Sequence, residues 1–206
     1  MRAPAKLFLA SSNPGKLGEF HALAPTAAPS ARVELELLPG FDSLPSCKEN
    51  APTFAENALG KALHYSRLRE GFVFADDSGL VVPALGGAPG VHSARYAGPS
   101  ATSAERITKL LGDLRRETGS QRAAHFVCAI ALAKQSHAIA VVTDRVDGEI
   151  LDAPRGGAGF GYDPIFYFPP LKKTFAELTA EEKNQHSHRG KAFRKLLAAL
   201  DVSPAR

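Results

Sequence analysis

The sequence predicts an α/β fold in which a mixed central sheet is flanked by helices. In the N-terminal part of the chain, short apolar runs alternate with helical patterns, an order that favours strands separated by helices. Two longer strand patterns, 124–133 and 138–146, then follow each other across the short segment from Lys134 to His137. Such a short connection is typical of an antiparallel hairpin, so the sheet should contain both parallel and antiparallel strands.

The first elements should be a strand, a helix and a second strand. Residues 6–10 form an apolar run that predicts a buried strand. Asn13 followed by Pro14 has the pattern of an N-cap and a first helical residue, which predicts a helix here. A loop rich in proline and alanine is expected over 24–31. Residues 33–37 alternate apolar and acidic side chains, which is typical of a half-buried strand.

Three threonine–glutamate pairs mark the starts of further helices. In each pair the two residues are spaced so that their side chains can form a capping box around the first helical turn. The pairs are Thr53 with Glu56, Thr102 with Glu105, and Thr179 with Glu182. Helices should therefore begin after each threonine, and a final helix is expected over about 190–200, with Ser187 as its cap.

Two further segments connect these helices. Residues 72–75 are apolar and predict a buried strand that ends at the polar stretch 76–79. The glycine-rich segment 153–164 predicts a loop. The sequence has no internal repeat, low-complexity tract or polar linker, so we expect residues 1–206 to form a single domain.

Composition limits the classes of protein to which the chain can belong. A hydrophobic share of 44% and a charged share of 22% are ordinary for a soluble globular protein. The two cysteines, Cys47 and Cys128, form no CxxC motif, which argues against a disulfide scaffold and fits a reducing, cytoplasmic location. Cys128 lies in an apolar run and should be part of the core. No apolar run approaches the roughly 20 residues that span a bilayer, so we expect no membrane partner.

Charge and sequence clusters point instead to an anionic ligand. The net charge of +4 is compatible with such a ligand and does not require nucleic acid. Five polar clusters place charge or glycine where a strand or helix should start or stop: 11–16, 53–57, 75–79, 159–163 and 187–190. A fold that brings these ends together would surround one polyanion with cations and acids, which suits a nucleoside triphosphate with a divalent metal.

The first of these clusters has the character of a phosphate site. Free backbone N–H groups at the start of a helix bind phosphate, and Lys16, one turn into the helix, could reach the same anion. The stretch is not a Walker A loop, because the GxxxxGK[ST] pattern is absent. An ordinary capped turn between a strand and a helix would explain the same residues.

The acidic clusters allow a metal site. Adjacent residues of a strand point in opposite directions, so one of Asp76 and Asp77 could face a ligand while the other braces the loop. A carboxylate in that position can hold Mg²⁺, although a solvated acidic turn would have the same sequence. Glu49 alone carries no functional signal, and Lys61 could be a solvent-facing lysine of its helix.

The last two clusters could contact the organic part of a ligand. The glycines of 159–163 allow close approach to a planar ligand, with Phe160 as a stacking face, although a flexible surface loop is an alternative. His186 and His188 resemble part of a zinc site, but no third ligand stands at a recognisable spacing. His188 and Arg189 at the start of a helix oppose its dipole, which an anion or a keto oxygen would relieve. Lys183 could point to the same place.

Together these stretches resemble the non-canonical purine nucleoside triphosphate pyrophosphatases, the inosine triphosphatase (Ham1-like) family. The resemblance runs from about residue 7 to residue 200. Each stretch alone is a weak signal, but all of them in this order and at these separations are highly specific. They are SNPGKLGE at 12–19, FAENA at 54–58 with Lys61 and Ala62, ADDSGL at 75–80, LGGAPGV at 85–91 with SARY at 93–96, GFGYDP at 159–164, and Glu182 and Lys183 with SHRG at 187–190.

The resemblance implies a fold, a reaction and a set of site residues. The fold would have two lobes with a cleft between them, and the protein would be an Mg²⁺-dependent homodimer. It would hydrolyse ITP, dITP, XTP and dXTP to the monophosphate and pyrophosphate. Asp77, Lys16 and Lys61 would be catalytic, and Glu49 and Asp77 would hold the metal. The positions that match substrate contacts are Ser11, Ser12, Asn13, Pro14, Gly15, Lys16, Ser78, Phe160, Gly161, Tyr162, Asp163, Lys183, His188 and Arg189.

One departure and two alternatives accompany this resemblance. The family commonly has Thr-Gly-Asn where this chain has Ser11, Ser12 and Asn13, so Ser12 adds a side chain where glycine would leave room. A Maf-like pyrophosphatase acting on pyrimidine or modified nucleotides shares the general architecture, but it lacks the signatures at 159–163 and 187–190. A non-catalytic nucleotide- or nucleic-acid-binding module would fit the basic final helix, yet no RNA-binding aromatic pattern or zinc-finger spacing occurs.

Overall fold

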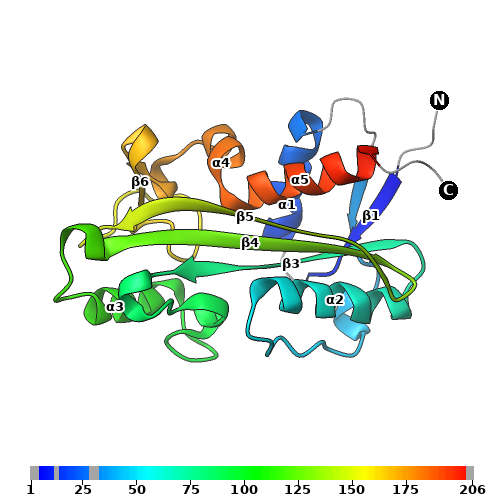
Figure 1. The fold of residues 1–206 in the computed structure, drawn as a ribbon, viewed down its shortest axis with the longest axis horizontal. Coiled ribbons are helices and arrows are strands. Elements are labelled where there is room, and N and C mark those ends of the chain that lie inside the picture. The colour runs from blue at the N-terminus through cyan, green and yellow to red at the C-terminus, as the bar shows by residue number, and fades with distance from the viewer. Residues whose placement is uncertain (1–4, 12–13, 28–32, 203–206) are drawn as a thin grey trace. The chain divides into compact units, whose positions relative to one another are not determined.

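The structure is a computed structural model that describes residues 5–11, 14–27 and 33–202 (Figure 1). In this part of the chain, seven strands form one sheet in the order β2-β1-β3-β4-β5-β6-β7. Strand β1 (Ala5–Leu9) pairs in parallel with β2 (Val33–Leu37) and with β3 (Phe72–Val81), whereas β5 (His137–Ile150) pairs in antiparallel fashion with β6 (Phe166–Phe168). The predicted mixed α/β fold is therefore confirmed.

The described residues divide into two compact units. The first unit contains the chain up to Asp77, together with Cys128–Asp144 and the C-terminal part from Arg189. The second unit contains Ser78–Val127 and Arg145–His188. The single domain and the cleft between two lobes, which we expected from the sequence, stay predictions.

In the first unit, helices cover both faces of the sheet. Helices α1 (Pro14–Ala27) and α5 (His188–Val202) pack on one face, and α2 (Phe54–Leu68) packs on the other (Figure 1). Phe20, Phe74 and Phe193 form the centre of the first face, with ring centroids 4.9–6.1 Å apart. The opposite core contains Ala58, Ala62 and Tyr65 of α2. Cys128 belongs to the first core and is fully buried, as predicted.

The long hairpin is formed by β4 (Ala123–Lys134) and β5. Gln135 and Ser136 connect the two strands and have φ angles of +48° and +67°. Two positive φ angles in a two-residue connection are typical of the tight turns whose twist matches that of an antiparallel pair. The hairpin predicted around 134–137 is therefore confirmed, and β5 continues to Ile150, beyond the predicted end.

The second unit is built around a cluster of phenylalanine rings. Phe126, Phe166 and Phe175 have ring centroids 4.5–5.7 Å apart. This unit contains parts of β3, β4 and β5, together with α3 (Ser103–Asp113), β6, β7 (Lys173–Thr174) and α4 (Ala180–His186). Complete capping boxes start α3 at Thr102 and α4 at Thr179, as the sequence predicts. No helix in the described part of the chain is both long and apolar enough to cross a membrane.

One prediction about β3 was wrong. We expected this strand to end at residues 76–79, but β3 continues through them to Val81. The apolar residues Leu80 and Val82 are fully buried, so the strand re-enters a core after its polar stretch. Strand β1 pairs with β3 only as far as Phe74, which leaves the two acids beyond the end of β1 while they remain in extended backbone.

Candidate active site

The two adjacent acids of β3 point to opposite faces of the sheet. Along this strand, Phe74 packs into the core beneath α1 and α5, whereas Val73 and Ala75 pack into the core beneath α2. Successive side chains of a strand alternate between its faces, so Asp76 belongs with α1 and α5, and Asp77 belongs with α2. The two carboxylates therefore point in opposite directions, as expected from the sequence.

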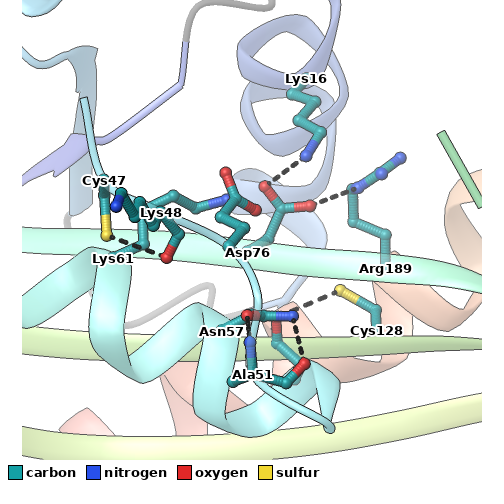
Figure 2. Close-up of polar contacts among 11 residues, drawn as sticks. Lys16, Cys47, Lys48, Ala51, Asn57, Lys61, Asp76, Cys128 and Arg189 are labelled. Atoms are coloured by element: carbon teal, nitrogen blue, oxygen red, sulfur yellow. Dashed lines mark hydrogen bonds and ion pairs between the residues drawn. The ribbon is translucent and has the colours of Figure 1, made fainter. Parts of the chain in front are cut away.

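Asp76 is a buried anion held by two cations. Nζ of Lys16 donates a hydrogen bond to Oδ1 of Asp76 at 2.9 Å, and Nε of Arg189 lies 3.6 Å from Oδ2 (Figure 2). The side chain of Asp76 is only 1% exposed. Burial alone would raise the pKa of this carboxyl, but the charges of Lys16, Arg189 and Lys61 hold it well below its usual range. Asp76 is therefore ionised near neutral pH.

Arg189 is bound from a second side by an acid of α1. Its Nη1 donates to Oε2 of Glu19, and its side chain is 4% exposed. Burial would lower the pKa of this guanidinium, but Asp76 and Glu19 raise it. A cation at the start of α5 opposes the helix dipole, and the two carboxylates offset that cost. The anion that the sequence led us to expect at this position is thus supplied, in part, by the protein itself.

On the opposite face, Lys61 lies among three carboxylates. Its Nζ donates to Oε2 of Glu49 at 2.9 Å, and its side chain is 10% exposed, so it is not a solvent-facing lysine. Burial would lower the pKa of Lys61, but the charges of Asp76, Glu49 and Asp77 raise it. Glu49 is the acid that carried no signal of its own in the sequence, and the loop before α2 brings it to this lysine.

Asp77 has the features of a carboxylate that is ready to bind a cation. Within the described ranges, its buried Oδ2 has no hydrogen-bond partner. Burial raises the pKa of Asp77. The charge of Lys61 and the side chain of Asn57 lower this pKa, whereas the charges of Glu49 and Asp76 raise it. Buried polar atoms are normally bonded, so an unpartnered carboxylate oxygen indicates that a ligand belongs there.

The acids around Lys61 suit a hard cation that shares its ligands with phosphate. Among the described residues, no group of three or more His, Cys, Asp or Glu side chains is arranged to hold a metal ion, which also leaves the zinc interpretation of His186 and His188 without support. Mg²⁺, however, requires only one or two carboxylates and takes its remaining ligands from water and phosphate oxygens. Glu49 and the open Oδ2 of Asp77 therefore fit Mg²⁺, and they would hold it through carboxylate oxygens.

In the second unit, Asp163 organises the glycine-rich loop. Its Oδ2 accepts hydrogen bonds from the backbone N–H of Phe160 at 2.9 Å and from Nζ of Lys183 at 2.8 Å. Nζ of Lys183 also lies 4.8 Å from the ring centroid of Phe160, whose side chain is half exposed. Gly159 has φ +77°, and a Cβ there would lie 2.2 Å from Oδ2 of Asp163. This loop is therefore an ordered structure that presents an aromatic ring and an ammonium group together.

Tyr162 and His188 are buried parts of the same unit. The hydroxyl of Tyr162 donates to the carbonyl oxygen of Ser93 at 3.0 Å, and burial raises the pKa of Tyr162 to about 12. The imidazole of His188 stacks on the ring of Phe126, with centroids 4.8 Å apart and an interplanar angle of 12°. Ser187 separates α4 from α5, so His188 begins the last helix, as expected.

The remaining predicted residues lie at the two ends of the phosphate cluster, in β3 and in the glycine-rich loop. Ser11 follows β1, and its backbone N–H donates to the carbonyl oxygen of Leu9 at 3.2 Å. Ser12 and Asn13 lie outside the described residues, so the effect of Ser12 on the phosphate loop stays a prediction. Pro14 and Gly15 are the first two residues of α1, and Ser78 is half-buried in β3. Gly161 has φ +62° and turns the loop before Tyr162.

Three residues around these groups were not identified from the sequence. Asn57 lies one helical turn before Lys61, and both are buried, so two polar residues on one face of a helix were the available signal. Glu19 stands one turn after Lys16 on α1, but its partner Arg189 is too distant in sequence to be found. Phe126 was expected only as a strand residue.

Replacing Asp76 with Asn should destabilise the protein and weaken its response to acid. Because the folded-state pKa of Asp76 lies below its ordinary 3.8, the ionised group stabilises the fold above that pH, and this contribution is lost as the pH falls through the folded pKa. At pH 7 the free energy of unfolding should fall by about 3 kcal/mol, since two buried cations lose this carboxylate. Urea unfolding at several pH values measures both effects.

The matched control is Asp147→Asn, which removes an exposed acid from β5. It should leave the free energy of unfolding within about 0.5 kcal/mol of the original. Equal losses of stability between about pH 4 and pH 2 in Asp76→Asn and in the unaltered protein would contradict the role given to Asp76.

Comparisons with known proteins show the family of this chain. The model of the Ham1 family matches residues 7–199. A protein of Geobacillus kaustophilus named dITP/XTP pyrophosphatase is 51% identical over 191 residues, which cover 93% of this chain and 92% of that protein. A Thermus thermophilus protein of the same name is 47% identical over 199 residues, 97% of this chain and 93% of that protein. The solved structure of a HAM1 protein from Coxiella burnetii has a TM-score of 0.85 and 42% identity, covering 97% of this chain and 100% of that one. The resemblance inferred from the sequence is confirmed, and the chain belongs to the Ham1 family.

Proposed function

We propose that this protein hydrolyses ITP, dITP, XTP and dXTP to the corresponding monophosphate and pyrophosphate, with Mg²⁺ as cofactor. The observation that carries the proposal is the arrangement around β3, where Lys16, Lys61, Glu49 and Asp77 surround one strand at the positions of the family motifs. The two bacterial relatives described above are named for pyrophosphate release from dITP and XTP, and each match covers nearly the whole chain.

The first unit would handle the phosphates. Free N–H groups at the start of α1 and the ammonium groups of Lys16 and Lys61 would bind the triphosphate. Since pyrophosphate leaves intact, water attacks the α-phosphorus and negative charge grows on the departing β-phosphate. The raised pKa of Lys61 keeps this group protonated, so it can stabilise that charge. Mg²⁺ held by Glu49 and Asp77 would neutralise phosphate charge and make nearby water more acidic.

Asp77 would take the proton from the attacking water or align that water. A carboxylate is a poor base for free water, but water near a bound Mg²⁺ is more acidic, which would bring the proton transfer within reach of Asp77. Asp76 has no such role, because its charge is committed to Lys16 and Arg189. The two neighbouring acids therefore differ in function: one positions cations and the other acts on the substrate.

The second unit would recognise the base. Phe160 presents an exposed ring for stacking, and Lys183, His188 and the loop backbone provide donors. Hypoxanthine and xanthine carry a 6-keto acceptor, whereas adenine carries an amino donor at the same position. Placing that amino group against donors leaves buried polar groups unpaired, at about 1–3 kcal/mol each. Such a cost would lower the use of ATP by roughly one to two orders of magnitude.

Assembly and location complete the proposal. The family resemblance implies a homodimer, and the low cysteine content fits a cytoplasmic enzyme. Residues 1–206 would act as one domain, with the nucleotide as the partner and without a nucleic acid.

A panel of nucleotides tests the proposed function against its alternatives. Pyrophosphate release would be measured with Mg²⁺ and ITP, XTP, GTP, ATP or UTP. We expect ITP and XTP to be used at least about tenfold more efficiently than ATP, for the reason given above. Preference for UTP would instead support the Maf-like alternative, and the absence of turnover with every nucleotide would support a non-catalytic module.

Replacing Asp77 with Asn should abolish most turnover while the protein still folds. Removal of a positioned base typically costs about 10²–10⁴-fold in rate, and loss of a metal ligand adds to this. The kcat for ITP and the circular dichroism spectrum measure both properties. Asp152→Asn, which removes an exposed acid of the second unit, is the control and should keep its rate. A retained rate in Asp77→Asn would remove Asp77 from the mechanism.

Replacing Gly159 with Ala should weaken binding of the base. The new Cβ would displace the carboxylate of Asp163, which holds both Phe160 and Lys183. We expect KM for ITP to rise about tenfold, comparable to the loss of one charged hydrogen bond, with a smaller change in kcat. Gly157→Ala is the control, because a Cβ there meets no atom within 4 Å. Similar KM values for the two variants would contradict the role of the Asp163 carboxylate.

A further inference from the structure

Asn57 is a buried amide placed between the two acids that fit a metal. It lies in the first turns of α2, and only 4% of the residue is exposed. Its Oδ1 accepts a hydrogen bond from the backbone N–H of Ala51 at 2.9 Å, and its Nδ2 donates to the carbonyl oxygen of Ala51 at 3.4 Å (Figure 2). Asn57 also interacts with the side chain of Asp77, and this interaction lowers the pKa of that carboxyl, as a hydrogen-bond donor does. One side chain therefore touches both the loop before α2 and the acid on β3.

The contact with Ala51 fixes the loop that carries Glu49. Ala51 is two residues after Glu49, in a segment without regular secondary structure. A second anchor lies farther back in this segment, where the carbonyl oxygen of Pro45 is 2.8 Å from Nε2 of His64. Between that anchor and the cap at Thr53, the two hydrogen bonds between Asn57 and Ala51 tie the backbone near Glu49 to α2, while Lys61 of the same helix binds the Glu49 side chain.

The contact with Asp77 fixes the orientation of the second acid. Because Oδ1 of Asn57 already accepts from Ala51, the amide must direct its N–H groups toward Ala51 and Asp77. Oδ2 of Asp77 has no hydrogen-bond partner in the described part of the chain, so the interaction with Asn57 leaves that oxygen available. An aspartate in place of Asn57 could not donate either bond, and an apolar residue could make none of the three.

We propose that Asn57 is a positioning residue that sets the relative placement of Glu49 and Asp77 for one divalent cation. The proposal rests on the proposed Mg²⁺-dependent function and adds a residue that contacts neither the cation nor the nucleotide. Groups that orient metal ligands from behind commonly contribute about 10–100-fold to metal affinity, which is the size of effect expected here.

The test measures binding of Mn²⁺ as a probe for Mg²⁺, by electron paramagnetic resonance on the full chain, together with the Mg²⁺ dependence of pyrophosphate release. In Asn57→Ala, the Kd for Mn²⁺ and the Mg²⁺ concentration for half-maximal activity should both rise about tenfold. At saturating Mg²⁺, KM for ITP should stay within about twofold of the original, since the phosphate and base contacts remain. A general loss of stability would not weaken metal binding while leaving KM for ITP unchanged.

Ser66→Ala is the matched control. Ser66 lies on the same helix, is equally buried, and binds a second loop by accepting the backbone N–H of Ser136 at 3.1 Å. Its removal should lower stability without changing the affinity for Mn²⁺. Asn57→Leu keeps most of the side-chain volume and should show the same loss of affinity as Asn57→Ala, which covers the case in which the smaller variant folds poorly.

The outcomes separate this inference from the function on which it rests. Affinity for Mn²⁺ within about twofold of the original in folded Asn57 variants, or an equal loss in Ser66→Ala, would overturn the positioning role. Pyrophosphate release that is independent of Mg²⁺ in the unaltered protein would overturn the metal-dependent function itself.

Discussion

The site depends on a constraint of β-strand geometry: two adjacent carboxylates must point to opposite faces of the sheet. Asp76 and Asp77 occupy consecutive positions of β3, which stays extended beyond the end of β1. Lys16 and Arg189 reach Asp76 from the face of α1 and α5, whereas Lys61, whose charge acts on both acids, comes from α2. This geometry explains why Lys16 and Arg189, which are far apart in sequence, meet at one acid.

The buried charged side chains on both faces must also be paired with opposite charges. A buried carboxylate or ammonium is costly unless it is paired and bonded. Asp76 pairs with Lys16 and Arg189, and Arg189 also pairs with Glu19. Lys61 pairs with Glu49 and lies near two further acids. These pairs are weak evidence for stability in themselves, but they hold the lysines where a triphosphate would need them. A polyanion with its metal could enter such a site by exchanging partners rather than by ordering new side chains.

Local signals in the sequence predicted much of the fold, whereas contacts between distant segments could not be predicted. The capping boxes at Thr102 and Thr179 located their helices, and the short connection after β4 located the hairpin. The end of β3 was wrongly predicted at 76–79. A short polar stretch is typical of a turn, but it also occurs where a strand passes from one hydrophobic core to another, as it does here. Glu19 and Arg189 are 170 residues apart, so no local rule could pair them. The family resemblance predicted which residues belong to the site, and the structure shows the contacts that several of them make.

The opposite pKa shifts of Asp76 and Asp77 follow from their charged neighbours rather than from burial alone. Burial acts in the same direction on both and by itself would raise each pKa. Around Asp76 the charges of Lys16, Arg189 and Lys61 exceed that effect, so its pKa falls and the ionised form is favoured. Around Asp77 the single charge of Lys61 is opposed by Glu49 and Asp76, so its pKa stays raised. An acid with a lowered pKa is suited to anchoring cations, and its neighbour with a raised pKa is the one to which the proposed function assigns the contact with water.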